Sequence, residues 1–162
     1  MALYPTEFAE NVEQLDVGIG ERGNAALNRL HEKGFSVATG LTTYYAGAVG
    51  VMGYQHHIRE YCPADATESR FGSVASTEKW LQKGGGRAMF LLLKGEGDDA
   101  QLEGYGWTGV DAHGALPDYP ITSAYRIGER ALGKGLAKDF AQAVVSGTNA
   151  LYAAGEGIGL EK

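Results

Sequence analysis

The sequence predicts an α/β fold, in which helices flank a sheet that contains at least one antiparallel hairpin. Arg87–Leu93 is an unbroken apolar run typical of a buried strand, and Gln101–Gly109 returns as a second strand after a turn at 94–99. Ile121–Ile127 is also strand-like, and a glycine turn separates it from the helix-like run Leu136–Val145. Strands that alternate with helical segments in this way favour a sheet covered by helices.

The first elements of the chain are a helix and two strands. Asn24–Lys33 has a helical pattern, with Asn24 as its cap and Gly34 as its C-terminal stop. Phe35–Ala38 and Thr42–Tyr45 are strand-like, with Gly-Ala-rich turns after them.

A further strand and two short helices precede the hairpin. Tyr54–Tyr61 is a strand candidate that the next proline closes. Residues 64–71 and 77–83 read as short helices, the second capped by Ser76 or Thr77.

Composition and charge exclude several classes of protein. A chain of 162 residues fits one domain, and it has no apolar run long enough for a transmembrane helix. Its start lacks the basic and apolar regions of a signal peptide, and Cys62 is the single cysteine, so we expect a cytoplasmic protein. A formal net charge of −6 argues against a nucleic-acid partner.

The glycine turn at 128–135 resembles two nucleotide-binding motifs without completing either. It matches the first seven positions of a Walker A loop, but Gly135 stands where Ser or Thr must hold Mg²⁺. A dinucleotide-binding turn needs a third glycine, and this chain has Lys138 there. A strand, a glycine turn and a helix still present backbone N–H groups and a positive helix end, which suits an anionic ligand.

The pattern R-x-x-G-x-G-x-A, formed by Arg130, Gly133, Gly135 and Ala137, resembles the acetyl-CoA motif of the GNAT superfamily of N-acetyltransferases. The order of elements is similar as well. Residues 56–61 would be the family's first strand, 64–71 and 77–83 its two helices, and 87–93 with 101–109 its central hairpin. The resemblance implies a mixed, mostly antiparallel central sheet flanked by helices, in which the strand before the acetyl-CoA turn splays from its neighbour.

The resemblance also implies acetyl-CoA as co-substrate. The backbone of Tyr125 and Ile127 would pair with the pantetheine arm. The pyrophosphate would be cradled by the backbone N–H groups of Leu132, Gly133, Lys134, Gly135, Leu136 and Ala137. The family often has arginine where this chain has Leu132, which removes one side-chain contact to phosphate. The alternative is a glycine turn that only lets a helix pack on a sheet.

The resemblance divides the chain into a GNAT-like core at 55–162 and an N-terminal segment at 1–54. The family continues beyond its fifth strand with a helix and two strands, whereas this chain ends near a strand candidate at 158–161. Asn24–Phe35 is similar to that later helix, so the N-terminal segment would either replace the missing elements or be an unrelated extension. We expect one compact unit.

Acetyl transfer needs a base, an oxyanion stabiliser and a proton donor. Glu103 and Glu129 are the candidate bases, and a backbone N–H near Ile127 would meet the oxyanion. The family frequently uses a tyrosine of its later helix as the general acid. By position, His31 would take this role if the N-terminal segment docks there, and Tyr152 is the alternative if it does not. Among the other residues, Cys62 has no partner for a catalytic triad.

These observations predict an acetyl-CoA-dependent N-acetyltransferase that transfers the acetyl group directly to a primary amine. The expected partner is a small-molecule or peptide amine, with a homodimer left open and neither nucleic acid nor membrane involved. The alternative is a non-catalytic, degenerate GNAT-like module that binds CoA or another protein.

Overall fold

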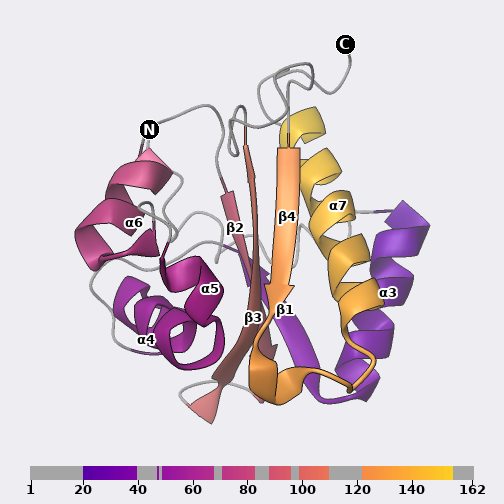
Figure 1. The fold of residues 1–162 in the computed structure, drawn as a ribbon. Coiled ribbons are helices and arrows are strands. Elements are labelled where there is room, and N and C mark those ends of the chain that lie inside the picture. Colours follow the sequence, from indigo (N-terminus) through magenta and orange to yellow (C-terminus); the bar gives the residue numbers. More distant parts are fainter. Residues whose placement is uncertain are drawn as a thin grey trace.

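Helices cover both faces of a single antiparallel sheet (Figure 1). The computed structural model describes residues 20–39, 47, 49–67, 71–82, 88–95, 99–109 and 122–154. The four strands lie in the sheet in chain order: β1 (Phe35–Thr39), β2 (Ala88–Lys94), β3 (Gln101–Gly109) and β4 (Thr122–Ile127). The predicted α/β class is therefore confirmed, and so is the antiparallel hairpin of β2 and β3.

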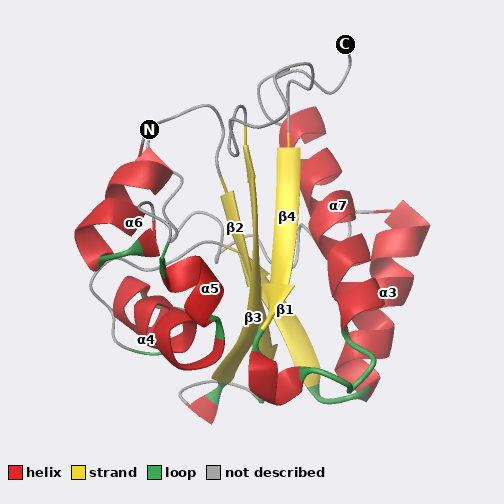
Figure 2. Cartoon of the chain, in the orientation of Figure 1, coloured by secondary structure: helices red, strands yellow, loops and turns green. Residues whose placement is uncertain are grey.

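The helices divide between the two faces of the sheet (Figure 2). On one face lie α3 (Gly20–Glu32) and α7 (Ala137–Ala154), side by side. On the other lie α4 (Val51–Tyr61), α5 (Pro63–Ala66) and α6 (Val74–Gln82). A short 3₁₀ helix, η3 (Glu129–Ala131), links β4 to the glycine turn before α7.

The two faces explain why β2 is apolar without a break. Side chains of a strand alternate between faces, so each face of β2 needs its own apolar set. Leu91 packs into the cluster that includes Tyr54 and Ile58 of α4. Leu92 packs into the opposite cluster, which includes Phe140 of α7. A central strand that is buried on both sides reads as a continuous apolar run.

The predicted strand at Tyr54–Tyr61 is wrong, because this segment lies in α4. Val51, Tyr54 and Ile58 are fully buried at spacings of three and four residues, which is the period of a helix. Pro63 does not close a strand; it is the first residue of α5, where a proline needs no N–H. Residues 56–61 are thus not the first strand of the sheet, and β1 pairs with β2 instead.

Several boundaries also differ from the prediction. Asn24 lies inside α3 and does not cap it, whereas Gly34 ends the helix as predicted, with φ +88°. The hydroxyl of Ser73 accepts the N–H of Ser76 at 3.1 Å, so Ser73 caps α6. Helix α7 runs to Ala154, well beyond its predicted end. The strands predicted at 42–45 and 158–161 lie outside the described residues.

The described part of the N-terminal segment does not extend the sheet beyond β4. Strand β1 pairs with β2 at the opposite edge, while α3 packs along α7 (Figure 1). Among the described residues, β4 is therefore an edge strand with one side unpaired. In the same part of the chain, no helix has the length and apolar character needed to cross a membrane.

Candidate functional site

The open edge of β4 presents the backbone groups of Tyr125 and Ile127. The N–H of Gly128 donates to the carbonyl of Glu103 at 2.8 Å, so Gly128 faces β3. Successive residues of a strand direct their backbone groups to opposite edges, and Tyr125 pairs with Gly106 two positions before Ile127 pairs with Gly104. Tyr125 and Ile127 therefore direct their N–H and C=O groups away from β3. These are the two residues that the resemblance assigns to a pantetheine arm.

A groove of about 430 Å³ runs beside this edge. Its walls come from the junction of α4 and α5, from β4, and from the start of α7. The lining residues are Tyr61, Cys62, Pro63, Ala64, Tyr125, Arg126, Ile127, Glu129, Leu132 and Ala137. Tyr125 and Leu132 are 43% and 61% exposed and give the groove apolar surface. The groove is thus mostly apolar, with Arg126 and Glu129 as its charged residues.

The glycine turn lies at one end of the groove. Gly133 and Gly135 have φ values of +81° and +72°, which side chains other than glycine rarely adopt. The first helical hydrogen bond of α7 runs from the N–H of Phe140 to the carbonyl of Leu136 at 2.9 Å. The N–H groups of residues 137–139 thus come before the first helical donor and have no helical carbonyl to donate to, as at any helix start.

The charges around the turn are mostly positive. Lys134 and Lys138 are exposed, and the ammonium group of Lys33 donates to the carbonyl of Gly135 at 3.0 Å. Asp139 could cap the helix, but its Oδ1 instead accepts from Nε of Arg29 at 2.8 Å. This leaves the start of α7 without a carboxylate cap from Asp139, which suits an anionic group from outside the chain.

Arg130 points away from the turn and is held by β3 and α4. Its Nε donates to Oε1 of Glu103 at 2.5 Å, and its Nη2 donates to the carbonyl of Leu102 at 3.1 Å. Its Nη1 donates to the hydroxyl of Tyr61 at 2.9 Å, and the guanidinium lies 4.3 Å from the centre of that ring. The motif arginine thus joins η3, which follows β4, to the interior, and Glu103 is buried in this ion pair.

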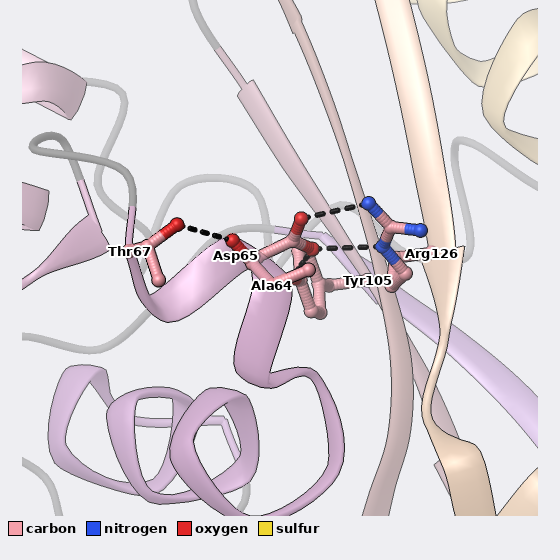
Figure 3. Close-up of polar contacts among 5 residues, drawn as sticks. All are labelled: Ala64, Asp65, Thr67, Tyr105 and Arg126. Carbon is pink, nitrogen blue, oxygen red and sulfur yellow. Dashed lines mark hydrogen bonds and ion pairs between the residues drawn. The ribbon is translucent and has the colours of Figure 1, made fainter.

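A second carboxylate–arginine pair links α5 to β4 (Figure 3). Asp65, which is buried, accepts from Nε and Nη2 of Arg126 at 2.9 and 2.7 Å, and also from the hydroxyl of Tyr105. The hydrogen bonds to Asp65 raise the pKa of Arg126, and burial raises the pKa of Tyr105 far above its ordinary value. Burial also raises the pKa of Cys62 to about 11, so its thiol is protonated at neutral pH.

His57 is buried behind the ion pair of Arg130. Burial first, and then the charges of Arg130 and His56, lower its pKa from 6.5 to about 4. Neither ring nitrogen has a hydrogen-bond partner within the described part of the chain. A cavity of about 210 Å³ adjoins the ring and is bordered by Arg130 and Tyr61. The imidazole is therefore neutral at pH 7 and packs chiefly as a ring against Tyr61 and Tyr105.

The structure brings some of the predicted site residues together and separates others. Glu129 is exposed and lines the groove. Glu103 does not line the groove; it is buried and forms an ion pair with Arg130. His31 is an exposed residue in the last turn of α3, a helix on the other face of the sheet from α4 and α5. Tyr152 lies in α7.

Sequence reasoning did not identify Tyr61 or Arg126 as groove residues. For Tyr61 a signal was available, because His57 and Tyr61 are four residues apart and share one face of a helix. For Arg126 the sequence holds no local signal, since its partner Asp65 is 61 positions away. Within the described ranges, no cluster of three or more His, Cys, Asp or Glu side chains could hold a metal ion.

Comparison with known proteins identifies no relative: no family model, no curated protein and no solved structure matches the chain. The resemblance to the GNAT superfamily therefore rests on the glycine motif and on the order of the elements from α5 to α7 alone, because residues 56–61 are not the family's first strand.

Proposed function

We propose that this protein is an acetyl-CoA-dependent N-acetyltransferase that transfers the acetyl group directly to a primary amine. The observation that carries the proposal is the edge of β4 with which no described strand pairs, where the backbone of Tyr125 and Ile127 faces a groove that leads to the glycine turn. An extended chain with amide groups can pair with such an edge as a further strand would. The pantetheine arm of CoA is a chain of this kind.

The turn and the start of α7 suit the pyrophosphate of CoA. Gly133 and Gly135 have no Cβ to keep a phosphate from the backbone, and the first N–H groups of α7 are not used by helical carbonyls. Lys134 and Lys138 add positive charge at the same end of the groove. Arg130 has a supporting role in this arrangement, because its side chain holds the segment before the turn against Glu103.

The groove contains the groups that the reaction needs. Glu129 would accept the proton that the attacking amine loses as its nitrogen bonds to the thioester carbon. The N–H of Ile127 faces the groove and would stabilise the oxyanion. As the carbon–sulfur bond breaks, the thiolate would take a proton from the hydroxyl of Tyr61, which already accepts a hydrogen bond from Arg130. We prefer Glu129 to Glu103 because Glu103 is occupied by Arg130.

Two measurements test the proposal in sequence. Acetyl-CoA at 100 times its dissociation constant should stabilise the protein by about 2.7 kcal/mol, seen as a thermal shift. Release of free CoA thiol should then be followed with a panel of primary amines. Glu129→Gln and Tyr61→Phe should lower kcat, whereas Glu60→Gln, an exposed change on α4, should leave it unchanged. The absence of any shift at millimolar acetyl-CoA would overturn the proposal.

One observation favours a second candidate, a CoA-binding module without catalysis. Asp65 and Glu103, the two buried carboxylates beside the groove, are both held by arginines, so Glu129 is the one carboxylate that lines it within the described residues. A thermal shift with acetyl-CoA, combined with no thiol release for any amine, would favour this candidate.

A further inference from the structure

Arg126 has a fixed guanidinium group with an unused side. Its Nε and Nη2 donate to the two carboxylate oxygens of Asp65. Its third nitrogen, Nη1, points away from Asp65 in Figure 3 and has no partner among the described residues. The side chain is 49% exposed and lines the groove.

The partner of Arg126 keeps the guanidinium in one orientation. The carboxylate of Asp65 is only 4% exposed, and the hydroxyl of Tyr105 also donates to it. A bidentate pair with a buried, hydrogen-bonded carboxylate fixes the plane of the guanidinium. An arginine held in this way loses little further side-chain freedom when its remaining N–H groups bind a ligand. Those N–H groups match the geometry of a second carboxylate.

The groove also carries a negative group close to Arg126. Glu129 lies three residues further along the chain and lines the same groove, with no ion pair to any described residue. The charges of both residues act on the thiol of Cys62, another residue of the groove. Between them the walls are apolar, formed by residues such as Ile127 and Pro63. The groove thus offers one donor site for an anion and one acceptor site for an ammonium group.

We propose that the acceptor is a small amino-carboxylic acid, whose carboxylate binds Nη1 of Arg126 and whose amine is directed to Glu129. This inference rests on the proposed acetyl transfer. The amine nitrogen bonds to the acetyl carbon and loses a proton to Glu129, the carbon–sulfur bond breaks, and the products are an N-acetyl amino acid and CoA thiol. A protein lysine or a polyamine carries no anion beside the amine, so it would leave the N–H groups of Arg126 without a partner.

The test compares acceptors that differ only in the anionic group. L-Alanine and L-leucine are compared with their amides, with thiol release from acetyl-CoA giving kcat/KM for each. We expect the acids to be preferred by about 10- to 100-fold, the effect of one charge-assisted hydrogen bond. Intrinsic reactivity would favour the amides, whose less basic amines are more deprotonated at neutral pH. A preference for the acids must therefore come from the site.

Two variants locate the preference. Arg126→Lys should bring the ratio of acid to amide close to one, while the thermal shift with acetyl-CoA remains as a check of folding. Arg59→Gln removes an exposed cation of α4 outside the groove and should keep the wild-type ratio. If Arg126→Lys does not fold, the wild-type comparison decides alone.

The outcomes separate this inference from the proposed function. Transfer to amines without a preference for the acids, or a preference that Arg126→Lys retains, overturns the inference and leaves the acetyltransferase proposal standing. No thermal shift with acetyl-CoA overturns both. A shift without thiol release from any acceptor overturns the inference and favours the non-catalytic module.

Discussion

Gly128 joins β4 to η3, and we expect that its replacement by alanine destabilises the protein chiefly through His57. A Cβ at this position would lie 2.7 Å from Cε1 and 2.9 Å from Nε2 of His57, and 3.2 Å from the carbonyl oxygen of Glu103. The backbone of Gly128 has φ −64° and ψ 149°, a conformation that any residue adopts. The substitution therefore tests steric contact without backbone strain.

The magnitude follows from overpacking of a buried site. His57 is 2% exposed and packs against the rings of Tyr61 and Tyr105, so it can move only towards the cavity that adjoins its ring. Forcing an extra methyl group into such a site costs about 1–3 kcal/mol. For a chain of 162 residues, this corresponds to a fall in Tm of about 2–12 °C.

A double-mutant cycle with His57→Ala identifies the cause. Once the imidazole is removed, the new methyl group has space, so Gly128→Ala should cost much less in that background. Urea unfolding of the wild type, both single variants and the double variant gives the coupling free energy, which we expect to reach about 1–3 kcal/mol. The reasoning is refuted if the two changes add within about 0.5 kcal/mol, the spread for independent sites.

Three further predictions concern the same core. Burial lowers the pKa of His57 from 6.5 to about 4, so the unfolded chain binds more protons between these pH values. Stability should be fully present above pH 6.5 and fall by up to about 3 kcal/mol towards pH 4, and urea midpoints for His57→Gln should vary less with pH. Gly147→Ala would gain about 1 kcal/mol of helix propensity, but its Cβ would lie 2.6 Å from Phe90, so calorimetry should show a lower Tm. Asp65→Ala should cost about 1–3 kcal/mol in urea unfolding, since Tyr105 loses its acceptor while the half-exposed Arg126 can be hydrated.

The elements that the sequence predicts well are those with a strong local pattern. β3 has the predicted bounds, and β2 and β4 differ by one residue at their ends. For β2, an apolar run bounded by glycines leaves little ambiguity. The strand predicted at Tyr54–Tyr61 was wrong because the aromatic and β-branched residues of this segment favour a strand by composition. The correct signal was the spacing of the side chains that tertiary packing buries, from Val51 to Ile58.

In the candidate site too, features with a local sequence signal could be predicted, and features that depend on distant residues could not. The glycines of the turn could be predicted, since positive φ values at Gly133 and Gly135 are a local property of the backbone. The roles of Arg126 and Arg130 could not, because their carboxylate partners lie 61 and 27 positions away in the chain. Only the packing of α5 and β3 against β4 brings these charges together.

The two carboxylate–arginine pairs have a common design that bears on function more than on stability. In each, the carboxylate is almost fully buried, 4% exposed at Asp65 and 3% at Glu103, while its arginine is 49% or 36% exposed. Burying a carboxylate costs desolvation free energy that an ion pair only roughly offsets, so such pairs add little net stability. What each pair supplies is a fixed guanidinium. Arg126 is fixed in the wall of the groove, and Arg130 is fixed against Tyr61, which lines the groove from the side of α4. Arg126 lies near the C-terminal end of β4 and Arg130 lies just beyond it in η3, so the two pairs hold this end of the strand in place, which favours a ligand that pairs with its edge.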